Sequence, residues 1–304
     1  MKHPYSSAGP LAHREAAATP LAERLPPQAY FVVSATFHYL GPACAALLFR
    51  FVEPLGVAWL RIATASVVFA CWRKPWRCMW RASAADRFTI VALGMSLALM
   101  NACFYLSIAR LPLATVGAIE FLGPIALAAA GARTRRNAVA LLLAVAGVCL
   151  LTEVRLSGAA LGYVFAFANC LLFVLYVVLG HRLATTGAAA GIDRLAAAML
   201  IAVMAAVPLG LREAIPAFHS PALLWAAAGV GISSSVIPYV ADQLAMARLP
   251  RASFALMLSL LPATATIIGL LVLKQVPKPV EVLAIALVIA AIALHRPQAT
   301  PVQG

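Results

Sequence analysis

Apolar residues along this chain are grouped into blocks of about 20, the length that spans a bilayer as an α-helix. Short polar segments separate the blocks, and many of them contain Pro, Gly or clustered Arg. Residues 1–28 and 296–304 lie outside the blocks and are predicted to be polar tails. The pattern predicts ten transmembrane helices, over residues 29–49, 55–72, 88–109, 112–132, 137–153, 158–180, 192–209, 221–246, 251–273 and 279–295.

The composition supports a protein that lies almost wholly within a membrane. Of the 304 residues, 63% are hydrophobic and 11% are charged, and the mean hydropathy is +0.94. A soluble domain has about 25% charged residues, so this chain has too few to cover a water-exposed surface. We therefore expect an all-α integral membrane protein with no separate soluble catalytic domain.

The net charge of +13 indicates the orientation of the chain in the membrane. In a soluble protein this charge would suggest binding to nucleic acid, but here most Lys and Arg residues fall in predicted loops on one side, together with both termini. That side is expected to be cytoplasmic, and no nucleic-acid partner is expected. Trp72, Trp76 and Trp80 lie between basic residues and are predicted to anchor the chain at the membrane surface.

Part of the sequence is repeated. The tetrapeptide Ala-Arg-Leu-Pro at residues 109–112 recurs at 247–250, and at the same offset Pro124 aligns with Pro262. Five predicted helices then fall in each half of the chain, and an odd number forces the second half to run upside down relative to the first. Such inverted repeats are common in secondary transporters. The predicted units are residues 29–153 and 158–295.

Prolines inside predicted spans remove backbone hydrogen bonds. In hydrocarbon, the freed carbonyls must be satisfied by protein or by water in a cavity. Gly123, Pro124, Pro238 and Pro262 are therefore candidates for helix breaks that line a pathway and act in gating. The alternative is that they produce kinks that only improve packing.

Three charged residues, Arg61, Glu120 and Asp242, lie well inside predicted spans. Each costs about 2.5–3.5 kcal/mol at a helix centre, so such residues face each other or a wet cavity. Arg61 and Glu120 are expected at similar depths. They could form an ion pair that holds helices in register, or they could bind the carboxylate and ammonium groups of a zwitterion such as an amino acid.

Further polar residues share helix faces with these charges. Asn101 and Tyr105 are one turn apart, and Tyr239 lies one turn before Asp242. Together with Arg61 and Glu120, the residues Asn101, Tyr105 and Tyr239 form the predicted substrate site. Alternatively, these polar groups only join helices to one another.

Coupling to protons would need a titratable group inside the membrane. Glu120, Asp242 and His38 are the candidates, although a neutral, packed His38 is the simpler interpretation.

No motif for other chemistry is found in the sequence. It contains no GxxxxGK[ST] phosphate loop, no HExxH or GxSxG motif, and none of its six cysteines form CxxC pairs. We therefore expect no metal, no cofactor and no enzymatic activity, and any transport must be driven by a gradient.

Several short segments resemble a known family. They are residues 56–61, 74–77, 104–108, 111–113, 120–124, 238–239 and 247–250. With the five-plus-five arrangement they resemble the drug/metabolite transporter superfamily of the EamA type, and within it the threonine/homoserine exporters of bacterial inner membranes. The likeness extends over about residues 29–295.

The resemblance implies efflux of small amino acids or related metabolites, by exchange with protons. Arg61, Glu120 and Asp242 coincide with charged positions of the family pattern. Two positions depart from the family pattern. Leu261 stands where the exporters tend to have an acidic residue, and Lys274-Gln275 stands where they usually have a Gly-Glu pair. Alternative interpretations are transport of a purine, nucleotide sugar or amphipathic drug, and more remotely a non-transporting membrane receptor or an intramembrane enzyme.

Overall fold

The computed structural model describes residues 26–131, 134–153, 160–184, 187–249, 254 and 260–294 of the chain. Within these residues the protein consists of helices joined by short loops and contains no strand. The elements are α2 (Pro27–Leu48), α3 (Pro54–Arg73), α4 (Pro75–Arg81), α5 (Ala84–Ile108), α6 (Leu113–Gly131), α7 (Arg135–Glu153), α8 (Ala160–Ala184), α9 (Ala188–Phe218), α10 (Pro221–Gly231), the π-helix η1 (Ile232–Val236), α11 (Ile237–Met246), α13 (Leu260–Leu273) and α14 (Pro279–Leu294).

Proline and serine mark the start of several helices. Pro54, Pro75 and Pro221 occupy the first positions of α3, α4 and α10, where a missing N–H costs no intrahelical hydrogen bond. At the start of α5, Ser83 Oγ accepts a hydrogen bond of 3.1 Å from the backbone N–H of Asp86. The local sequence therefore determines where these loops end.

Helical structure occupies each predicted span where the structure describes it, but two elements differ from the prediction. Helix α9 has 31 residues, whereas the hydropathy pattern predicted only 192–209. The part of α9 that lies outside the predicted span includes charged side chains, which lower the hydropathy but do not break a helix. The pattern also missed α4, a short helix in which tryptophan and arginine residues are interspersed.

Among the described residues, six helical stretches are both long and apolar enough to cross a membrane. Shorter apolar stretches occur in α6, α13 and α14. The six long stretches are Ala29–Leu48, Pro54–Arg73, Ala84–Ile108, Ala160–Ala184, Ala189–Phe218 and Pro221–Met246.

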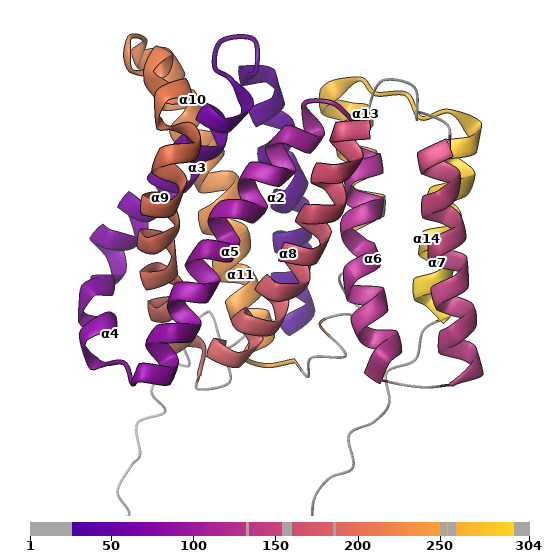
Figure 1. Cartoon of the computed structure of the whole chain (residues 1–304), viewed down its shortest axis with the longest axis horizontal. Helices are drawn as coiled ribbons and strands as arrows, with labels where there is room; N and C mark the ends of the chain where they lie inside the picture. Colours follow the sequence, from indigo (N-terminus) through magenta and orange to yellow (C-terminus); the bar gives the residue numbers. More distant parts are fainter. Residues whose placement is uncertain are drawn as a thin grey trace, which may run out of the picture.

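The helices stand side by side in a bundle (Figure 1). Helix α2 packs against α11 and α13, α5 packs against α8 and α9, and α3 packs against α9. Helices α7 and α14 form a pair at one side of the molecule (Figure 1). Elements far apart in the sequence are thereby brought together around α2 and α5.

The two ends of the bundle differ in charge. One end of the bundle contains α4, the ends of α3 and α8, and the starts of α5, α7 and α9 (Figure 1). We call this the basic end because Arg73, Arg87, Arg135, Arg182 and Arg194 lie there.

The outer surface of the bundle is apolar, and polar side chains are buried within it. Leu171, Met204, Trp225 and Leu271 are each at least 70% exposed, as expected for side chains that face lipid. The interior contains buried charged and amide side chains, and these define the candidate site.

Candidate functional site

Arg61 of α3 is 3% exposed and is held by the π-helix. Its Nε donates to Ser235 Oγ at 2.7 Å, and its Nη2 donates to the backbone carbonyl of Ser234 at 2.5 Å. The guanidinium carbon lies 5.6 Å from the ring centroid of Tyr105 and 5.9 Å from that of Tyr239. Aromatic faces attract a cation at these distances, so the charge is stabilised without a carboxylate.

The Ser234 carbonyl is available to Arg61 because Pro238 follows four residues later. In an α-helix the N–H of residue 238 would donate to this carbonyl, but proline has no N–H. The chain instead forms η1 over Ile232–Val236, directly before α11. Such π-helical turns are frequent at functional sites.

Glu120 of α6 is 1% exposed and is held by neutral donors from two other helices. Tyr39 OH of α2 donates to Oε2, and Asn169 Nδ2 of α8 donates to Oε1, both at 2.9 Å. His38 Nε2 lies 3.6 Å from Oε2, the distance of an ion pair when His38 is protonated. The carboxylate is therefore accommodated among groups that α2, α6 and α8 contribute.

Asp242 of α11 lies in a separate buried network. Ser34 Oγ of α2 donates to Oδ1, and Tyr176 OH of α8 donates to Oδ2 at 2.9 Å. Tyr176 also packs against Tyr239, with 5.5 Å between the ring centroids. This contact joins the Asp242 network to the surroundings of Arg61.

A small cavity separates Arg61 from Glu120. Its volume is about 10 Å³, which is the room needed for a single water molecule. Among the described residues no ion pair joins the two side chains, because each is bonded to other groups. The cavity is lined by His38, Arg61, Met100, Asn101, Phe104, Glu120, Asn169 and Tyr239.

The residues predicted from the sequence have different positions relative to this cavity. Tyr105 contacts Arg61 beside the cavity. Five predicted residues border the cavity, namely His38, Arg61, Asn101, Glu120 and Tyr239. Asn101 Nδ2 donates to the Leu97 carbonyl at 2.7 Å and lies 3.4 Å from Tyr239 OH. Asp242 is buried outside the cavity lining.

The predicted helix-break residues are placed as follows. Pro238 is buried at the start of α11. Gly123 is buried on α6, where a Cβ atom would lie 3.1 Å from the Cys170 carbonyl of α8. Pro124 and Pro262 fall within α6 and α13, and their side chains lie outside the part that the structure describes.

Several residues of these networks were missed in the sequence. Tyr39 directly follows His38, and Asn169 is a single amide in an otherwise apolar span; both could have been noticed as polar residues at membrane depth. Asn169 Oδ1 is buried and has no hydrogen-bond partner in the described part of the protein. The Ser234 carbonyl did have a signal in the sequence, because Pro238 leaves the carbonyl four residues before it without an N–H donor. The sequence did not show that Arg61 would bind this carbonyl.

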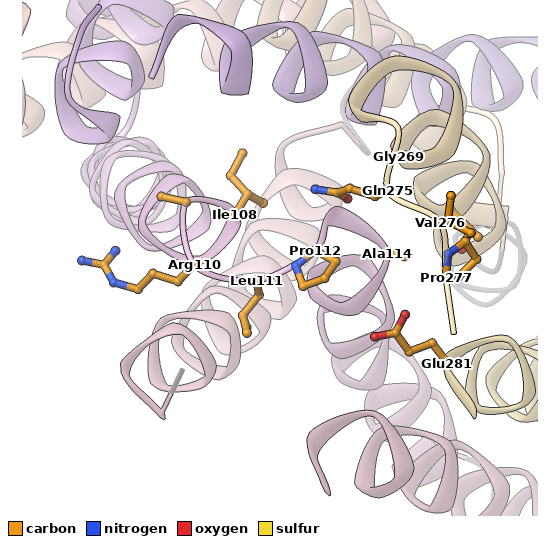
Figure 2. Close-up of a pocket in the computed structure, with 12 residues that line it drawn as sticks. Ile108, Arg110, Leu111, Pro112, Ala114, Gly269, Gln275, Val276, Pro277 and Glu281 are labelled. Carbon is orange, nitrogen blue, oxygen red and sulfur yellow. The ribbon is translucent and has the colours of Figure 1, made fainter. Parts of the chain in front are cut away.

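A larger pocket opens at the end of the bundle opposite the basic end. It measures about 320 Å³ and lies between the α5–α6 and α13–α14 loops (Figure 2). Gln275 Oε1 accepts a hydrogen bond of 3.1 Å from the Leu113 backbone N–H there. Arg110 extends away from Gln275 and Glu281 (Figure 2) and donates to the Leu106 carbonyl. This pocket shares no lining residue with the buried cavity.

Comparison with known proteins identifies the family. Residues 160–295 match the model of the EamA-like transporter family. Over 258 residues the chain is 33% identical to the threonine/homoserine exporter RhtA of Escherichia coli K12, which covers 83% of this chain and 84% of that exporter. The chain belongs to the EamA-like transporter family. RhtA of Salmonella typhimurium LT2 matches this EamA-like transporter with the same identity and coverage.

A solved structure supports the fold of this EamA-like transporter. That structure, described only as "Crystal structure of protein", aligns with a TM-score of 0.57 over 89% of this chain and 98% of its own length, at 17% identity. With its apolar helices, the EamA-like protein is therefore a multi-pass membrane transporter.

Proposed function

We propose that this protein exports small amino acids such as threonine and homoserine across the bacterial inner membrane. The observation that supports this most directly is that Arg61 and Glu120 border one cavity while neither neutralises the other. A zwitterion needs opposite charges on the two sides of its site. Relatives that are 33% identical are threonine/homoserine exporters.

The substrate binds between the two charges. Arg61 takes its carboxylate and Glu120 takes its ammonium group, both through charge-assisted hydrogen bonds. Asn169 Oδ1, which no group in the described residues uses as an acceptor, accepts a hydrogen bond from the side-chain hydroxyl of the substrate. Asn101, Tyr105 and Tyr239 form the walls of the site.

Transport proceeds by alternating access. A cavity of about 10 Å³ cannot hold an amino acid, so helices must separate toward one side and then the other. We propose ten transmembrane helices in two inverted repeats, residues 29–153 and 158–295, with both termini cytoplasmic. The backbone near Gly123, Pro124, Pro238 and Pro262 allows this movement.

Export is coupled to proton entry. His38 Nε2 lies 3.6 Å from Glu120 Oε2, so a proton delivered to this carboxylate and the substrate ammonium compete for the same oxygen atoms. The side chain of Asp242 is a second buried carboxylate, and it is bonded to α2 and α8, the helices that also bind Glu120.

Counterflow in proteoliposomes tests the proposal. Purified protein is reconstituted into vesicles, and the vesicles are loaded with unlabelled threonine. The uptake of labelled threonine, homoserine, a purine nucleoside and a nucleotide sugar is then compared at two pH gradients. We expect counterflow of the amino acids alone, with a rate that changes with the pH gradient. Counterflow of only the nucleoside or the sugar would overturn the substrate assignment.

Variants of the two charges test the site. We expect Glu120→Gln to reduce threonine counterflow about 10- to 100-fold, since one charged hydrogen bond is worth about 1.5–3 kcal/mol. Glu53→Gln, which changes an exposed carboxylate at the opposite end from the basic end, serves as the control and keeps normal transport. Loss of transport in Arg61→Lys but not in Glu120→Gln would instead indicate an anionic substrate.

A further inference from the structure

A second cluster of charged side chains lies outside the transport site, at the basic end. A hollow of about 360 Å³ is formed there by α3, α4, α5 and α9. Its charged lining consists of Arg73, Arg77, Arg81, Arg194, Asp86 and Asp193.

Two of the four arginines are neutralised within the hollow. Arg73 Nε lies 2.6 Å from Asp193 Oδ1, and Arg194 Nη2 lies 3.4 Å from Asp86 Oδ2. Arg77 and Arg81 are exposed, and neither has a carboxylate partner in the described part of the protein. The hollow therefore has an excess of two positive charges.

Helix α4 presents this excess charge in a defined position. Arg77 and Arg81 are four residues apart, so they lie on one face of α4. Arg87 of α5 donates to the carbonyls of Met79 and Trp80 at 3.1 and 3.0 Å and so holds the end of α4. Helix α4 also packs against α9.

Exposed tryptophans place the hollow at the depth of lipid headgroups. Trp72, Trp76 and Trp80 are 52%, 48% and 84% exposed. Tryptophan is enriched where hydrocarbon meets the headgroup layer, because its ring is apolar and its N–H needs a polar partner. A ligand with an anionic group and an apolar chain could therefore contact both the arginines of the hollow and the exposed tryptophans.

We propose that this hollow binds the phosphate of an anionic phospholipid, such as phosphatidylglycerol. The Arg77 and Arg81 guanidinium groups donate to the phosphate oxygens, a geometry that suits the planar fork of arginine. The acyl chains lie along the tryptophan side of α4. A free phosphate ion would fit the charges but would leave this apolar surface without a partner.

Native mass spectrometry of the full chain, purified in detergent with an equimolar mixture of phosphatidylglycerol and phosphatidylethanolamine, tests the proposal. We expect the protein to retain phosphatidylglycerol preferentially. In Arg77→Gln/Arg81→Gln we expect this retention to fall about 10- to 30-fold, because each basic residue near a membrane contributes about 1 kcal/mol. Arg50→Gln/Arg212→Gln removes the same charge at the other end and should retain the lipid.

Two outcomes of this experiment would overturn the proposal. One is equal retention of both lipids by the unaltered protein. The other is displacement of phosphatidylglycerol by millimolar inorganic phosphate, which would indicate a site for the free ion.

Fluorescence provides a second test that leaves both arginines in place. The double variant Trp59→Phe/Trp225→Phe keeps only Trp72 at the end of α3 and Trp76 and Trp80 of α4. Brominated phosphatidylglycerol should quench these tryptophans more than brominated phosphatidylcholine does at the same mole fraction. Equal quenching by the two lipids would contradict the proposal.

Discussion

At the scale of single residues, the site is organised by how each buried charge is satisfied. Arg61 is bonded to a hydroxyl and a carbonyl, and Glu120 to a phenol and an amide. Neutral partners reduce the cost of burial but leave the net charge in place. A substrate of opposite charge can therefore still gain from binding.

Asn169 offers a test of this arrangement. Asn169→Ala removes the amide that donates to Glu120 Oε1 and the Oδ1 acceptor that has no partner among the described residues. We expect the KM for threonine to rise about tenfold, because this is the effect of losing one hydrogen bond to a charged group. The measurement is the concentration dependence of threonine counterflow. Thr36→Ala, which removes an exposed hydroxyl of α2, should leave KM unchanged.

The sequence identified the charges but not all of their partners. Arg61, Glu120 and Asp242 stand out because any charge in an apolar span is costly. Tyr39, Asn169 and Tyr176 are visible as polar residues in the spans, but the sequence does not show that they bind a charge, because tyrosine and amide side chains also occur in membrane helices as packing groups. Their roles depend on which helices meet, and that information is not local.

At the scale of elements, the contact between α2 and η1 determines where Arg61 lies. Gly41 of α2 packs against Ser234 so closely that a Cβ atom would overlap the Ser234 side chain and backbone. The same serine provides the carbonyl for Arg61. The close approach of α2 and the position of the guanidinium group are therefore linked.

Substitution of Gly41 tests this link. Gly41→Ala forces α2 away from η1, and we expect a loss of about 1–3 kcal/mol in stability, as for other overpacked sites, together with lower transport. The readout is the thermal unfolding midpoint in detergent. Gly229→Ala is the matched control, because no atom of the described residues lies within 4 Å of its added Cβ atom. A similar loss of stability in both variants would contradict the argument.

Pro238 provides a separate prediction at this scale. Pro238→Ala restores an N–H that competes with Arg61 for the Ser234 carbonyl, so we expect counterflow to fall while the unfolding midpoint stays the same or rises. Pro208→Ala, at an exposed proline within α9, should not reduce counterflow. Unchanged transport in Pro238→Ala would show that the freed carbonyl is not needed.

At the scale of the whole molecule, hydropathy located helical segments because a helix that crosses lipid needs a long apolar run, and six of the described helical stretches have one. It failed at α4, where tryptophan and arginine residues are interspersed, and at the C-terminal end of α9, where Arg212 and Glu213 lower the hydropathy. The pairing of α7 with α14 and the central position of α2 were not predicted, because apolar faces differ little from one another.

The distribution of arginine predicts the orientation of the whole chain. Because basic loops stay cytoplasmic, a fluorescent protein fused after Gly304 should fluoresce in bacteria. Alkaline phosphatase fused after Phe218, at the other end of α9, should be active outside the cytoplasm. The reverse pattern would show that the basic end faces outward.

The cavity between Arg61 and Glu120 has a consequence for the energy economy of the cell. A space of about 10 Å³ has room for a single water molecule, so no file of water fits between these two side chains. We expect the protein in this form to leak few protons or sodium ions when no substrate is present. Many copies could then remain in the membrane during starvation without lowering the voltage on which other processes depend.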